Sequence, residues 1–284
     1  MEIKAKSVRF DRYIPILTIQ DGVVVSKRGE LTVGWEVALP PLCSVTEDGY
    51  EDMLESLSSA VRSLGQGFIV HRQDIYLKDS YHAEKTGGFL SESYERHFDA
   101  RDHLTHRQYL FLTLALKDAP SRGISSSGAF GISFPKGELL AKDLATLLSK
   151  ATEFASVISG RGGYGLKPLD DRELAALVHR HTCLHSSDGV FSDLEPYPDK
   201  VKCGPRTLWA YSISESRALP SLLNPSQRAD SLSGGSSEIR LSTAAAIGPL
   251  LDCEHMVNTY VFTLNQGETM REMGGRKRRM TSMS

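Results

Sequence analysis

The stretch IPILTIQDGVVVSKRGELTVGWEVAL, residues 14–39, decides the fold class. Two β-rich runs, residues 14–20 and 23–27, are separated by Asp21-Gly22. This dipeptide between β-branched runs is a strong hairpin signal, because both turn positions need a positive φ. A second turn follows at residues 27–30, and from Leu31 to Leu39 apolar residues alternate with polar or small ones. The stretch therefore predicts three strands, the last with one buried face.

An amphipathic helix is predicted after these strands. Apolar residues recur at helical spacing from Tyr50 to Leu64, with Ser44 or Thr46 as the N-terminal cap and Gly65 just beyond the end. A strand at residues 68–77 follows, so the chain begins β-β-β-α-β. The later run QYLFLTLAL, residues 108–116, is apolar on both faces, which suits a central, covered strand. The predicted fold class is α+β, with a mixed, largely antiparallel sheet, packed helices, and a second, smaller α/β subdomain.

The remaining elements suggest a division into three parts. Helices are expected at 92–98, at 138–159 and from Asp170 or Asp171 to about His185, and strands at 207–214 and 254–264. The predicted domains are an N-terminal α+β subdomain at 1–117, a loop and helical segment at 118–205, and a second sheet-containing segment at 206–284.

Composition is that of an ordinary globular protein. The 284 residues are 40% hydrophobic and 24% charged, and the net charge of −2 gives no bulk attraction for polyanions. No apolar run reaches the roughly 18 residues that span a bilayer, and the first residues lack the apolar region of a secretory signal. The four cysteines form no C-x-x-C pair. This pattern predicts thiols in a reducing cytoplasm.

A phosphate-binding loop is missing from the sequence. Nucleoside triphosphatases of the P-loop class need G-x-x-x-x-G-K-[S/T], in which backbone N–H groups wrap the phosphates and the lysine reaches the terminal ones. No Gly-Lys-Ser or Gly-Lys-Thr occurs in the chain. The glycine-rich residues 160–165 follow a helix and contain no lysine, so they are interpreted as a helix stop and loop. The chain is predicted to be inactive as an ATPase by itself.

A histidine- and cysteine-rich segment provides the only weak metal candidates. His181 and His185 are four residues apart and would share one helix face, but His179 and Cys183 would share another. No glutamate completes an H-E-x-x-H motif, so solvated helix histidines are favoured and no metal is assigned. Histidines and aspartates among residues 97–106 could also form an acid–base site, but chance composition explains this grouping. The sequence contains no G-x-S-x-G motif, which would indicate a serine nucleophile. No catalytic or cofactor-binding residue is therefore predicted.

A basic patch ends the sequence, formed by Arg276, Lys277, Arg278 and Arg279. Such clusters can bind nucleic acid or anionic lipid. Four charges on a polar tail are more typical of a solvated linker, and the acidic overall balance argues against direct nucleic-acid binding.

Four blocks of the sequence resemble one known family in the same order. They are FDRYIPILTIQDGVVVSKRGELTVGWEVALP from residue 10, HRQDIYL from residue 71, FLSESYERHFDARDHLTHRQYLFLTL from residue 89, and YGLKPLDDRELAALV from residue 164. These blocks are similar to the TraG-family conjugation ATPases of conjugative transposons, which energise type IV secretion during DNA transfer. The resemblance extends over about residues 8–280.

The resemblance implies a docking role. Family members have a non-catalytic N-terminal half that docks onto inner-membrane channel components and contributes to oligomer assembly, followed by a RecA-like motor. This chain corresponds to the N-terminal half, so ATP and Mg²⁺ are implied only for a C-terminal domain beyond residue 284. The resemblance thus implies a cytoplasmic protein at the inner membrane, with secretion components and a homo-oligomer as partners. Two alternatives stay open: a free-standing metal-dependent enzyme using His181 and His185, and a nucleic-acid-binding accessory module using the basic patch.

Overall fold

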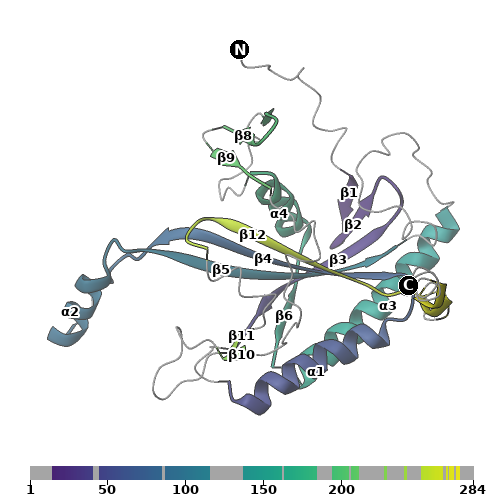
Figure 1. Ribbon diagram of the computed structural model, residues 1–284, viewed down its shortest axis with the longest axis horizontal. Helices are drawn as coiled ribbons and strands as arrows, with labels where there is room; N and C mark the ends of the chain where they lie inside the picture. Colours follow the sequence, from purple (N-terminus) through teal and green to yellow (C-terminus); the bar gives the residue numbers. More distant parts are fainter. Residues whose placement is uncertain are drawn as a thin grey trace, which may run out of the picture. The chain divides into compact units, whose positions relative to one another are not determined.

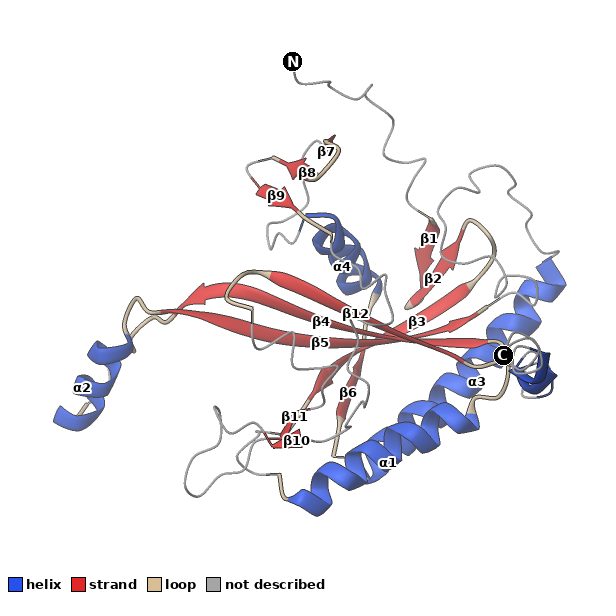
Figure 2. Cartoon of the chain, viewed as in Figure 1, coloured by secondary structure: helices blue, strands red, loops and turns tan. Residues whose placement is uncertain are grey.

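The computed structural model describes residues 15–40, 45–84, 87–115, 137–161, 163–183, 194–204, 206–210, 227–228, 240–241, 251–264, 267, 269–271 and 273–275. Its helices are α1 (Glu47–Ser63), α2 (Phe89–Phe98), α3 (Gly137–Arg161) and α4 (Asp171–Cys183). Its strands are β1 (Ile16–Gln20), β2 (Val23–Ser26), β3 (Leu31–Ala38), β4 (Phe68–Ser80), β5 (Asp102–Leu114), β6 (Gly165–Pro168), β7 (Leu194–Pro196), β8 (Val201–Cys203), β9 (Arg206–Leu208), β10 (Gln227–Arg228), β11 (Arg240–Leu241) and β12 (His255–Phe262). Figure 2 shows this mixture of helices and sheet, which confirms the α+β class and the β-β-β-α-β start.

The main sheet follows the order β1-β2-β3-β5-β4-β12, and β6 also pairs with β3 (Figure 1). Within it, β1 pairs with β2, β2 with β3 and β3 with β6, each in antiparallel orientation. Strand β5 lies between β3 and β4, so its apolar character on both faces correctly predicted a central strand. Smaller sheets are formed by β7-β8-β9 and by β10-β11.

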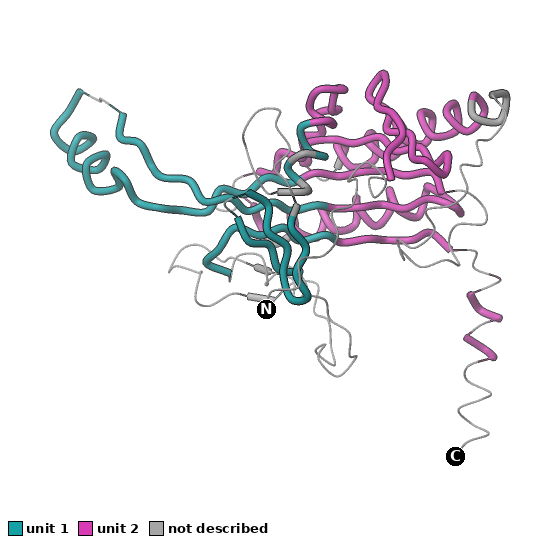
Figure 3. The backbone as a smooth tube through the Cα atoms, turned by 90° about the horizontal axis from the view of Figure 1, so that it is seen from above, with its two compact units in different colours: residues 1–7, 73–108, 176–258 teal, residues 8–72, 109–175, 259–284 magenta. Residues whose placement is uncertain are grey.

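Two compact units share the chain, as Figure 3 shows. One comprises residues 1–7, 73–108 and 176–258, and contains α2 and the β7-β8-β9 sheet. The other comprises residues 8–72, 109–175 and 259–284, and contains β1, β2, β3, α1, α3 and β6. No described helix is long and apolar enough to cross a membrane.

The first hairpin forms as its sequence predicts. Asp21 and Gly22 have φ values of 53° and 74°, the left-handed region that a type I′ turn needs at both positions. The turn brings Gln20 opposite Val23, which sets the register of β1 and β2. On the next strand, the alternating residues Leu31, Val33 and Trp35 are buried, which confirms the predicted apolar face at these positions. Strand β3 ends at Ala38, and Leu39, the last residue of the predicted alternation, is 41% exposed.

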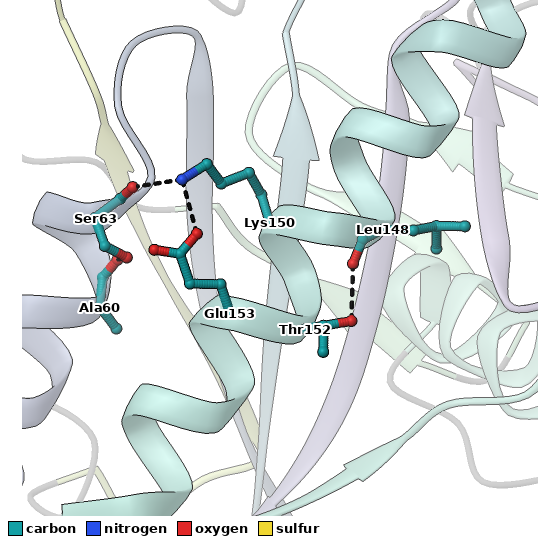
Figure 4. A network of polar contacts seen from close by, with 6 residues as sticks. All are labelled: Ala60, Ser63, Leu148, Lys150, Thr152 and Glu153. Carbon is teal, nitrogen blue, oxygen red and sulfur yellow. Dashed lines mark hydrogen bonds and ion pairs between the residues drawn. The ribbon is translucent and has the colours of Figure 1, made fainter.

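Helices α1 and α3 cover that apolar face. Trp35 lies against Phe154 of α3, with ring centroids 6.1 Å apart, in a core that also holds Leu112 of β5. Figure 4 shows how α3 is tied to the end of α1: the Lys150 ammonium donates to the Ser63 carbonyl at 2.9 Å and contacts the Glu153 carboxylate at 2.8 Å. The lysine thereby satisfies a carbonyl in the last turn of α1, where a positive charge is favourable.

The opposite face of β3 depends on a glycine. A Cβ atom on Gly34 would lie 2.7 Å from the Phe111 ring and 3.1 Å from Leu169, so only glycine lets Phe111 pack directly on the strand. Strand β6 pairs with β3 through Trp35 and Pro168. The sequence analysis predicted no strand here, because four residues are too few to show a period.

Helix α4 begins with a capping box. The Glu173 amide donates to the Asp170 carboxylate at 2.8 Å, and the Asp170 amide donates to the Glu173 carboxylate at 3.0 Å. Lys167 donates a further hydrogen bond to Glu173, which lowers the pKa of that carboxyl. Asp170 is thus the cap, and the neighbouring Asp171 instead accepts hydrogen bonds from the amides of Asp21 at 3.2 Å and Gly22 at 2.7 Å.

Loss of the Asp171 carboxylate should loosen the hairpin. The Asp171→Ala variant leaves two turn N–H groups without their acceptor, and we expect the free energy of unfolding to fall by about 1 kcal/mol, because the site is exposed to water. Urea denaturation followed by circular dichroism measures the change. Arg172→Ala, one residue along the same exposed turn, is the matched control and should change stability by less than about 0.5 kcal/mol.

Candidate functional site

The most exposed apolar surface among the described residues belongs to α2, the helix that joins β4 to β5. We call Phe89, Leu90 and Tyr94 the α2 surface; their exposed fractions are 85%, 81% and 59%. None of the residues of α2 is buried. Figure 1 shows the helix beyond the ends of β4 and β5, away from the strands that it connects. An apolar cluster of this kind on a surface marks an interaction site more often than a packing defect.

Polar contacts tie α2 to the segment that follows β4. The Glu95 carboxylate accepts hydrogen bonds from the Tyr81 hydroxyl at 2.8 Å and from the Glu84 amide at 2.9 Å. The first of these bonds raises the pKa of the Tyr81 phenol, because it stabilises the protonated form. At the other end, Asp99 accepts from the Ala83 amide at 3.2 Å. These bonds fix the helix through its carboxylates and leave the α2 surface in contact with water.

Phe98 is the one aromatic residue of α2 that turns back toward the strands. Its ring lies 4.6 Å from the Tyr94 ring and 6.3 Å from the Tyr81 ring, in an edge contact with the latter. The Arg101 guanidinium lies 5.3 Å from the Phe98 centroid, as in a cation–π contact. Phe98 therefore anchors the helix, whereas Phe89 and Leu90 are left for another molecule.

A second grouping lies on β4 and β5 and is largely buried. The Asp74 carboxylate accepts a hydrogen bond from the Gln108 amide at 2.8 Å, and the same oxygen lies 2.9 Å from His106 Nε2. Asp74 is buried and His106 is partly open to water. A buried carboxylate needs such partners, because an unpaired charge in a strand would cost several kcal/mol.

Tyr76 extends this grouping to a third strand. Its ring is stacked between His106, at 4.6 Å, and His255 of β12, at 4.4 Å. His255 Nδ1 lies 2.6 Å from the Cys253 carbonyl, so Nδ1 carries the proton, and the buried Nε2 has no hydrogen-bond partner among the described residues. We define Asp74, Tyr76, His106, Gln108 and His255 as the β4–β5–β12 cluster. Among the described contacts of its imidazoles, none is a hydrogen bond to a hydroxyl or a thiol.

The side chains of the two weak metal candidates lie outside the part of the chain that the structure describes. His181 lies on α4, but its side chain is outside the described residues, as are His185 and the basic patch of Arg276, Lys277, Arg278 and Arg279. Among the side chains that the structure describes, no group of three or more His, Cys, Asp or Glu could hold a metal ion.

The acid–base grouping drawn from residues 97–106 separates into unrelated contacts. Asp102 accepts from the Ser80 hydroxyl at 2.7 Å, whereas His106 turns to Asp74, a residue that sequence reasoning did not single out. The sequence signal that could have identified Asp74 is its place in the middle of the strand HRQDIYL, since a buried carboxylate requires partners on neighbouring strands.

The cysteines differ from one another. Cys203 is disulfide-bonded, so the expectation of a thiol is wrong at this position. Cys253 is a free and exposed thiol. The spacing of cysteines in the sequence gave no signal for the bond, because a disulfide depends on the distance between residues in the fold.

Comparison with protein-family models gives a match over the start of the chain. The family model described as "Domain of unknown function, B. Theta Gene description (DUF3875)" matches residues 3–54, a segment that includes β1, β2, β3 and the start of α1. No curated protein matches the chain.

Proposed function

We propose that this chain is the non-catalytic N-terminal part of a TraG-family conjugation ATPase and that it docks to inner-membrane components of a type IV secretion system during DNA transfer. The α2 surface carries the proposal, because Phe89 and Leu90 are almost fully exposed on a helix that polar bonds hold in place. In this role the chain is a cytoplasmic protein peripheral to the inner membrane.

The chemistry of the α2 surface suits a protein partner with an apolar groove. Leu90 and Tyr94 are four residues apart and lie on one side of the helix, the spacing by which helices anchor in grooves. Phe89 adds an aromatic ring beside them. Large apolar and aromatic side chains that enter a pocket supply most of the binding energy of an interface. We therefore assign these three side chains as the anchors for the secretion component.

The proposal assigns no ATP binding or hydrolysis to residues 1–284. The chain contains no lysine-bearing phosphate loop. ATP and Mg²⁺ belong, in the proposal, to an ATPase domain that follows in the complete protein. The chain then contributes attachment and assembly, and the motor contributes hydrolysis.

Replacement of two of the three anchors, Phe89 and Leu90, should reduce DNA transfer. In donor cells that express the complete gene, the Phe89→Ser/Leu90→Ser variant is expected to transfer DNA at least tenfold less often, because loss of about 1–2 kcal/mol per anchor weakens docking by that factor or more. Mating frequency measures the effect, and immunoblots check the protein level. Leu54→Ser, a change at another exposed leucine on α1, is the matched control and should leave transfer unchanged.

A binding measurement separates docking from other causes. The purified chain should bind detergent-solubilised inner-membrane components encoded by the same conjugative element, and the double variant should bind them at least tenfold more weakly. Equal binding and equal transfer by the variant would contradict the proposed role. ATP hydrolysis that follows the purified chain through a matched variant control would contradict the non-catalytic assignment.

A further inference from the structure

The two edges of the main sheet are built differently. Strand β1, at one edge, is five residues long and has a register shift between Ile16 and Thr18. Short length and bulges are devices that prevent an edge from pairing with another strand. Strand β12, at the other edge, has neither device, and residues 256–264 contain no charged residue and no proline. An edge of this composition is a template for a further strand.

The backbone groups of β12 are available for such pairing. The Thr263 amide donates to the Phe68 carbonyl at 3.0 Å, and the Thr263 carbonyl accepts from the Gly67 amide at 3.3 Å. Both groups of Thr263 thus point toward β4. Because this direction alternates along a strand, both groups of Tyr260 and of Phe262 point away from β4, toward the edge at which no described strand pairs with β12.

A row of aromatic rings leads to the same edge. Phe111 of β5 stacks on His71 of β4 at 5.3 Å, and His71 stacks on Tyr260 of β12 at 4.3 Å with an interplanar angle of 13°. Tyr260 is 43% exposed, and its ring lies 6.5 Å from the ring of Phe262 on the same strand. Val261, Phe262 and Leu264 beside it are exposed as well.

We propose that β12 pairs with β12 of a second copy of this chain, antiparallel about a two-fold axis that places Tyr260 opposite the second copy's Tyr260. Each tyrosine then exchanges both backbone hydrogen bonds with its counterpart, and the aromatic row continues from one sheet into the other. In this register Thr259 lies opposite the second copy's Val261, which joins two β-branched side chains on the other face.

A second copy fits the edge better than a charged or proline-rich segment would. The strand that covers residues 256–264 must itself be uncharged, because a charge beside Val261 or Phe262 would lose its water. Residues 256–264 of a second copy meet that requirement. A two-fold axis covers this stretch in both copies at once. The pairing uses a surface distinct from α2 and goes beyond the docking role proposed above.

A charge exchange tests the pairing. Variants with Thr259→Glu/Val261→Glu and with Thr259→Lys/Val261→Lys place like charges opposite each other in each homodimer. By sedimentation equilibrium the unaltered chain should form a concentration-dependent dimer, and each variant alone should have a dimer dissociation constant at least tenfold higher. An equimolar mixture of the two variants should restore the dimer, which also shows that both are folded. A chain that stays monomeric, or variants that dimerise alone as well as the parent, would overturn the proposal.

Cross-linking tests the register. In a Cys253→Ser background, Tyr260→Cys places two cysteines at a distance that a disulfide can bridge, whereas Val257→Cys, on the same strand, does not. Oxidation should give a covalent dimer with Tyr260→Cys and none with Val257→Cys on a non-reducing gel. Cross-linking at 257 and not at 260 would exclude the two-fold axis at Tyr260.

Discussion

The Phe154→Ala variant is expected to lose about 3–5 kcal/mol of unfolding free energy. Phe154 is fully buried on α3 and packs against Trp35, in the core where α1, α3 and the sheet meet. Alanine would leave a cavity among side chains that strands and helices hold in place, so the surroundings could collapse only in part. Urea denaturation, followed by far-ultraviolet circular dichroism, measures the loss.

A control on the same helix separates packing from helix propensity. Leu148 also lies on α3 and is exposed, so Leu148→Ala removes apolar atoms without opening a cavity. Alanine favours helices at least as well as leucine does, and the expected change is less than about 0.5 kcal/mol. Equal losses for the two variants would contradict the core that α3 forms with β3 and β5.

Sequence predicted the elements whose signals are local. Asp21-Gly22 specifies its own turn, and the alternation from Leu31 to Leu39 identifies the buried face of β3 without any knowledge of the partner strands. The helix at Glu47–Ser63 was predicted with two competing caps, and Thr46 is the observed one, since its hydroxyl accepts from the Gly49 amide. In each case the decisive contacts lie within a few residues of one another.

Elements whose ends are set by distant contacts were predicted less well. Strand β5 was expected from residue 108 and begins at Asp102, because His103 and Arg107 are polar and exposed there and give no strand signal. Strand β9 ends at Leu208, earlier than expected; Trp209 and Ala210 are not in a strand, and residues 211–214 lie outside the described part of the chain.

The candidate site was harder to predict than the fold. Exposure of Phe89 and Leu90 depends on where α2 sits, and both residues precede the helix that the sequence predicted at 92–98. The partners of Asp74 lie on another strand, 32 and 34 residues away. Asp171 contacts a turn about 150 residues away. Such pairs follow from strand order and register, which a single sequence does not specify.

Removal of the Asp74 carboxylate is the second change with a large expected effect. The Asp74→Ala variant leaves the buried Gln108 amide without its acceptor and takes the partner from His106. A lost hydrogen bond to a charged, buried acceptor costs about 1.5–3 kcal/mol, and the unpaired amide adds to that loss. We expect a decrease in unfolding free energy of about 2–4 kcal/mol, measured by urea denaturation.

The Asp74→Asn variant separates charge from hydrogen bonding. Its amide oxygen can still accept from Gln108, so the loss of unfolding free energy should be about half that of alanine. The two variants together measure how much the negative charge contributes.

The sign of the stability change in Asp74→Ala also distinguishes a structural cluster from a functional one. Groups that serve binding or catalysis are often held at a cost in stability, so their removal stabilises a protein. If Asp74→Ala raises the unfolding free energy, the β4–β5–β12 cluster is kept for a function, and its imidazoles become the residues to test next.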